Sequence, residues 1–169
     1  MTPITVTLTG TTPLLCGRPA TEQNLDGQAP RAQAAARLYL DQAGQPVLPG
    51  LNILRCICGA ERGRKSSVAQ VMPHLGVQER EVRILSPRPW VVDTRSVRLP
   101  QTGERGLCHR PRFDDWRLVF TLLVETGALE EAGIHQMVHL AGRRIGIGDY
   151  RPERGGPFGR FDVAGWEVR

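Results

Sequence analysis

The sequence predicts an α+β fold whose strands and helices follow one another in the order β-α-β-β-α-β. The first observation is an alternation near the N-terminus, where Ile4, Val6 and Leu8 share one face of a strand and threonines the other. The second is the helical spacing of apolar residues in two segments, 51–62 and 129–142. Two such helices are expected to pack on one face of a sheet.

The third observation is the most apolar segment of the chain, 116–125, which is typical of a central strand. The first strand is expected to run on through 12–15. A last strand or pair of strands is expected at 161–163 and 166–168. Short β-prone pieces supply the remaining strands: 82–85, 90–92 and 96–99.

Insertions interrupt this order. Segment 17–36 is polar and rich in glycine and proline, which indicates a long mobile loop that ends in a helical turn at 31–36. Segment 37–48 has the pattern of a small β-hairpin. Residues 86–112 are expected to form an inserted loop or hairpin, with 101–112 as a loop. Without these insertions, the order is that of the ferredoxin-like, or RRM-like, fold.

Composition narrows the class of protein. Residues 1–169 have the usual length of one domain, and 40% of them are apolar. No apolar run approaches about 18 residues, and no export signal is visible, so a cytoplasmic protein without a membrane span is expected. The cysteines are expected to stay reduced, and Cys56 and Cys58 lie too close in sequence for a zinc site. No nucleoside triphosphate or NAD cofactor is expected, because the only lysine, Lys65, is not part of a phosphate-loop motif and the glycine-rich segment follows a helix instead of a strand.

The charge balance favours a polyanionic partner. The formal net charge is +5, with 22 basic residues against 17 acidic ones, and every basic residue except Lys65 is an arginine. The planar guanidinium group grips phosphate with two parallel hydrogen bonds and stacks on bases. A basic domain of this kind is a candidate for nucleic-acid binding.

The glycine-rich segment 146–161 is the most informative part of the sequence. Its glycines allow close backbone approach and can present N–H groups to phosphate, while its arginines add charge and Tyr150 can stack on a base. A plain turn without a ligand is the alternative. The candidate nucleic-acid-binding residues of this region are Arg143, Arg144, Gly146, Gly148, Tyr150, Arg151, Arg154, Gly156, Gly159 and Arg160.

A second basic cluster precedes the central strand, at 105–113. Its arginines could pair with phosphates and its phenylalanine could stack on a base, or it could be a solvated loop with Phe113 in the core. Arg95 and Arg98 could place two guanidinium groups on one sheet face. The candidate residues here are Arg95, Arg98, Arg105, Arg110, Arg112 and Phe113.

The glycine-rich segment resembles a known family. Residues 145–148 and 156–161, after a helix and before the last strand, are similar to the glycine-rich loop of the RAMP superfamily, the ferredoxin-fold RNA-binding proteins of CRISPR systems. The resemblance implies binding of single-stranded nucleic acid, RNA more than DNA, and assembly as a homo-oligomer or as a subunit of a ribonucleoprotein complex. In outline the chain is similar to a small backbone-type subunit or to a phage or mobile-element relative of one.

Two other classes of function stay open. One is a metal-independent endoribonuclease of the CRISPR RNA-processing kind, with His109 and Tyr150 as acid–base candidates. The other is an adaptor or inhibitor that imitates a CRISPR backbone subunit and binds protein instead of nucleic acid. His135 and His139 share one helix face but lack a third metal ligand, so no metal site is expected.

Overall fold

The computed structural model describes residues 1–18, 25, 27–60, 68–98 and 102–169. Its centre is a four-stranded antiparallel sheet in the order β10-β1-β9-β5. The strands are β1 (Thr2–Gly10), β5 (Leu75–Val77), β9 (Arg117–Val124) and β10 (Phe161–Val168), and the helices between them are α2 (Gly50–Gly59) and α4 (Glu131–Leu140). The sheet therefore places the fourth, first, third and second strands side by side, which confirms the ferredoxin-like expectation.

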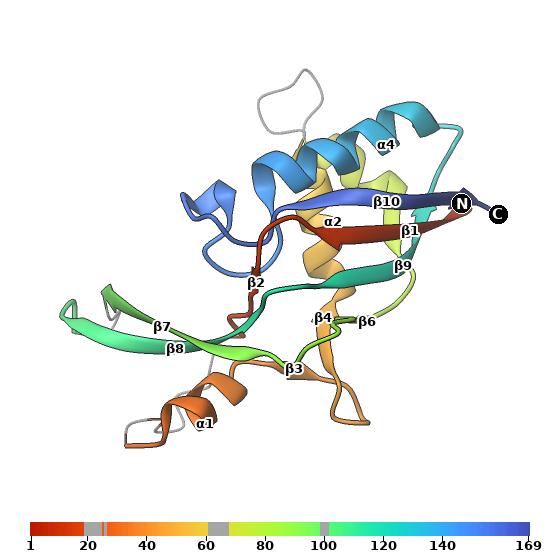
Figure 1. The fold of residues 1–169 in the computed structure, drawn as a ribbon. Helices are drawn as coiled ribbons and strands as arrows, with labels where there is room; N and C mark the ends of the chain where they lie inside the picture. The colour runs from red at the N-terminus through yellow and green to blue at the C-terminus, as the bar shows by residue number, and fades with distance from the viewer. Residues whose placement is uncertain (19–24, 26, 61–67, 99–101) are drawn as a thin grey trace.

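The alternating residues of β1 explain how the sheet receives its helices. Ile4, Val6 and Leu8 are fully buried in the main core with α2 and α4, whereas Thr5 and Thr7 on the other face are half-buried. Figure 1 shows α4 running along β10, with α2 behind the sheet. Burial of this apolar stripe is the main stabilising contribution of the sheet–helix contact.

The insertions form two smaller sheets beside the central one. One contains β3 (Tyr39–Leu40), β4 (Pro46–Pro49) and β6 (Glu81–Arg83); the other contains β2 (Leu14–Leu15), β7 (Val91–Arg98) and β8 (Arg105–Phe113). Strands β7 and β8 make a long hairpin that projects from the body of the molecule, with the short helix α1 (Pro30–Ala35) beneath it (Figure 1). The remaining short elements are α3 (Val68–Val71), η1 (Met72–His74), the π-helical turn η2 (Ala141–Ile145) and η3 (Pro152–Arg154).

Three sequence predictions about the strands are wrong. Most of 101–112 is not a loop but strand β8, which pairs with β7 along its whole length. The second strand of the central sheet is β5, not the pieces within 82–99, which belong to the two smaller sheets. The first strand ends at Gly10, and Leu14–Leu15 pairs instead with β8.

The long loop expected at 17–36 falls partly outside the described residues, which omit 19–24 and 26. Its last part contains α1, close to the helical turn expected there. In the described part of the chain, no helix combines the length and the apolar character needed to cross a bilayer.

Candidate nucleic-acid interface

The two basic clusters of the sequence meet at the base of the hairpin. The guanidinium group of Arg95 on β7 lies 4.7 Å from the ring centre of Phe158 and 5.7 Å from that of Tyr150. On β8, Nε of Arg110 lies 2.8 Å from Oδ2 of Asp149. Cation–π contacts and an ion pair therefore hold the hairpin against the glycine-rich segment.

Most candidate glycines of this segment serve the fold of the loop itself. The N–H groups of Gly146, Gly156 and Gly159 donate to the carbonyls of Ala141, Arg151 and Pro13, respectively. These amides are therefore not free to bind phosphate, and this part of the expectation is wrong for those three residues. Among the described residues, the Gly148 amide has no such acceptor, so it alone of the four remains a phosphate donor candidate.

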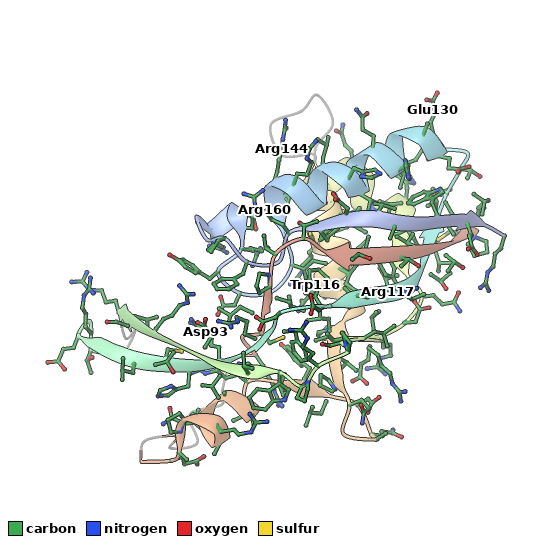
Figure 2. The ribbon with its side chains drawn as sticks, in the orientation of Figure 1. Asp93, Trp116, Arg117, Glu130, Arg144 and Arg160 are labelled. Carbon is green, nitrogen blue, oxygen red and sulfur yellow. The ribbon has the colours of Figure 1, made fainter. Side chains whose placement is uncertain are left out.

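Several candidate arginines are paired with carboxylates. Asp93, which is 6% exposed, accepts hydrogen bonds from Nε of Arg95 at 2.6 Å and from Nη1 of Arg112 at 3.2 Å. Arg112 also contacts Asp114, and Arg151 contacts Glu153 at 2.7 Å. Figure 2 shows Asp93 on the hairpin below the glycine-rich segment. These pairs order the surface, but they also compensate much of its positive charge.

The pKa of Asp93 has a direct consequence for stability. Burial alone would raise it, but the hydrogen bonds and charges of Arg95 and Arg112 hold it below its ordinary value of 3.8. A carboxyl group with a lowered pKa in the folded state stabilises the fold fully above that ordinary value. The stabilisation is lost as the pH falls through the folded-state pKa.

We therefore expect Asp93→Asn to lower the free energy of unfolding by about 2 kcal/mol near neutral pH. The difference from the wild type should shrink as the pH falls below about 4, because the carboxyl is then protonated first in the unfolded state and, at still lower pH, in the folded state. Urea denaturation across this pH range measures both effects. Asp162→Asn is the matched control, because Asp162 is exposed and makes no ion pair with another described residue. If Asp93→Asn lowered the free energy of unfolding by the same amount at every pH, the stabilisation would not come from the charge of Asp93.

A cleft of about 670 Å³ lies between the glycine-rich segment, α2 and β3. We call it the arginine cleft, because Arg55 and Arg154 line it together with Asn52, Tyr39 and Gly148. The acidic residues that line it are already paired: Asp149 with Arg110, and Glu153 with Arg151, which also lines the cleft.

The exposed side chains of Arg55 and Arg154 thus have no ion-pair partner among the described residues. Two uncompensated guanidinium groups at one cleft favour an anionic ligand. Sequence analysis identified Arg154 and Gly148 but missed Arg55, Asn52 and Tyr39. The sequence signal for Asn52 and Arg55 was their spacing of three residues, which places both polar side chains on the exposed face of α2.

Buried cysteines line the wall of the arginine cleft. Burial raises the pKa of Cys16 to about 12, with the charge of Asp149 adding to the effect. Burial also raises the pKa of Cys56, whose thiol donates to the Gly146 carbonyl at 3.1 Å. Both groups are therefore neutral thiols, and Cys56 attaches the glycine-rich segment to α2.

Other candidate arginines lie apart from the cleft. Arg98 and Arg105 are opposite each other at the outer end of the hairpin, where Nε of Arg98 donates to the Gly103 carbonyl. The expectation that Arg95 and Arg98 share one face of the sheet is wrong, because residues three apart in a strand point to opposite sides.

The remaining arginine candidates surround η2. The Arg160 guanidinium donates to the Arg143 carbonyl, and Figure 2 places Arg144 and Arg160 near the C-terminal end of α4. The arginines of the sequence prediction thus form separate groups and not one continuous track.

The proposed catalytic pair is not assembled. His109 is only 9% exposed, and its Nδ1 lies 2.8 Å from Oγ1 of Thr94. Its neighbour Arg110 points to the opposite face of β8, toward the glycine-rich segment that carries Tyr150. Phe113 is 3% exposed and belongs to the core, so it is not a free stacking surface.

The helix α4 carries no metal cluster in the described residues. The rings of His135 and His139 are 4.7 Å apart, and His135 also packs on Trp166. Within the described ranges, no group of three or more candidate ligands could hold a metal ion.

Comparison with known proteins defines the fold further. No protein-family model and no curated protein matches this chain. A solved chain of similar structure comes from a cryo-EM structure of type III-B Cmr-beta bound to cognate target RNA. The two share a TM-score of 0.70 at 14% sequence identity, over 99% of this chain and 60% of the other. This chain therefore spans less than two thirds of that protein, and it has the same fold as part of a subunit of an RNA-bound assembly.

Proposed function

We propose that this chain is a RAMP-like subunit that binds single-stranded RNA within a ribonucleoprotein complex. The observation that carries the proposal is the arginine cleft, where Arg55 and Arg154 lie without ion-pair partners among the described residues. Their guanidinium groups bind phosphate oxygens of the strand, and the Gly148 amide adds a neutral donor at the same wall.

The aromatic side chain next to the cleft supports binding of a single strand. Tyr150 is 42% exposed and has a φ of 47°, a conformation that costs a non-glycine residue on the order of 1 kcal/mol. The neighbouring residues Asp149 and Arg151 both line the arginine cleft. Tyr150 does not itself line the cleft, but it lies between two residues that do, and an unpaired base of a strand in the cleft can stack on its exposed ring.

The preference for RNA and the place in an assembly rest on the structural likeness. The similar chain belongs to a complex described as bound to cognate target RNA, and the likeness extends over almost the whole of this chain. The projecting hairpin adds a contact surface for a neighbouring subunit or strand, since Leu107 is 66% exposed near the outer Arg98–Arg105 pair (Figure 1). Homo-oligomers along a strand are one such assembly.

Binding to RNA is expected to be electrostatic and specific for single strands. A fluorescently labelled oligoribonucleotide should show increased anisotropy with the purified protein, and its duplex form should bind more weakly. If about three phosphates are neutralised, affinity should fall on the order of tenfold between roughly 50 and 200 mM salt. A matched DNA oligonucleotide tests the choice of RNA.

Absence of binding to any single strand at low salt would refute this proposal. In that case, a protein-binding adaptor would explain the fold. Cleavage of the RNA in the presence of EDTA would instead establish an endoribonuclease. Such an outcome is not expected from the buried position of His109.

A further inference from the structure

A second cavity lies on the other side of the β3–β4 hairpin. It is an open groove with a volume of about 540 Å³. We call it the apolar groove. Its wall presents polar as well as apolar groups, and its apolar residues include Leu38, Ile84, Pro87, Trp90 and Phe113.

The apolar groove and the arginine cleft share a thin partition. Along β3, Tyr39 lines the cleft, whereas the flanking Leu38 and Leu40 line the groove. On β4, Pro46, which pairs with Leu40, also lines the groove. Because successive residues of a strand point to opposite sides, a single two-stranded hairpin separates the two cavities.

The charges around the groove suit an anionic strand. Among the described residues that line the groove, none carries a carboxylate and the one charged side chain is that of Arg88. The Arg88 side chain is 74% exposed, and its contact with Asp115 is long, at 3.5 Å. On α1, the Arg31 guanidinium lies 4.2 Å from the ring centre of Trp90. A tryptophan in the wall, with arginines at the rim, matches a nucleotide whose base lies in the groove and whose phosphate lies outside it.

We propose that the apolar groove receives a base of the same single strand whose phosphates occupy the arginine cleft. This inference rests on the proposed function. The strand passes over the edge of the β3–β4 hairpin, so that this hairpin separates a phosphate-binding side from a base-binding side. The cationic rim and the adjacent cleft favour a nucleobase over an apolar peptide as the occupant.

Photo-crosslinking with an RNA that contains 5-iodouridine tests this inference, because this base crosslinks to aromatic side chains in contact with it. We expect a crosslink in the peptide that contains Trp90, in addition to one at Tyr150. If the RNA binds but crosslinks occur only within the glycine-rich segment, the groove inference is wrong and the proposed function stands. If the RNA does not bind at all, the proposed function itself fails.

Variants separate base contact from folding. Trp90→Ala should weaken RNA binding about tenfold, the value of one stacked base, and Trp90→Phe should restore most of the affinity. Trp166→Ala is the matched control, because Trp166 packs on His135 of α4, outside both cavities. Urea denaturation verifies that each variant is folded. Wild-type affinity in a folded Trp90→Ala variant would overturn the inference. Binding of a peptide in the groove that leaves the affinity for RNA unchanged would also overturn it.

Discussion

Replacing Gly159 with alanine is expected to destabilise the protein by about 3 kcal/mol or more. Gly159 has a φ of 73°, and an added Cβ would lie 1.7 Å from the carbonyl oxygen of Ile147. That oxygen belongs to the backbone and cannot move aside, because Ile147 also donates its N–H to the Gly159 carbonyl. The glycine-rich segment would have to open, and RNA binding should be lost with it.

Gly155 in the same segment provides a matched control. It also has a positive φ, 76°, but nothing lies within 4 Å of an added Cβ. Gly155→Ala should therefore cost only the backbone strain, about 1 kcal/mol. Urea denaturation gives the free energy of unfolding of each variant, and the difference between them is the cost of the steric clash at Gly159. Equal stability of Gly159→Ala and Gly155→Ala would contradict the close contact between Gly159 and the Ile147 carbonyl.

The double variant Arg55→Ala, Arg154→Ala is expected to weaken RNA binding on the order of tenfold to hundredfold. Both side chains are exposed at the arginine cleft and make no ion pair with another described residue, so their removal should leave the free energy of unfolding nearly unchanged. Anisotropy titrations at low salt measure the loss.

A variant with the same change of net charge is the control. Arg80→Ala, Arg169→Ala also removes two exposed arginines, neither of which lines the cleft. The affinity of this control for RNA should fall by only about twofold, because the positive electrostatic potential of the whole protein becomes weaker. If both double variants lose affinity equally, the cleft is not a specific site and RNA binding depends on net charge alone.

The elements with strong local patterns were predictable from the sequence. The alternation of Ile4, Val6 and Leu8 and the apolar run that became β9 each specify their own structure through burial. Strand β5 was not predictable, because Leu75–Val77 is only three residues long and has Gly76 at its centre. It is a strand only because β9 pairs with it.

The candidate site was only partly predictable for a different reason. The arginine-rich clusters were visible as composition, but their ion pairs depend on register. Asp93 and Arg112 are 19 positions apart and meet only because β7 and β8 align. The arginine cleft likewise joins α2, an inserted hairpin and the glycine-rich segment, whose proximity results from the tertiary fold.

The salt dependence of RNA binding tests the central claim most directly. Each phosphate contact with a single strand contributes roughly 0.7 to the slope of log affinity against log salt. The Arg55→Ala, Arg154→Ala variant should therefore have a slope shallower than that of the wild type by about 1.4. The same slope in both proteins would mean that these arginines do not touch the RNA backbone, and would contradict the assignment of the cleft.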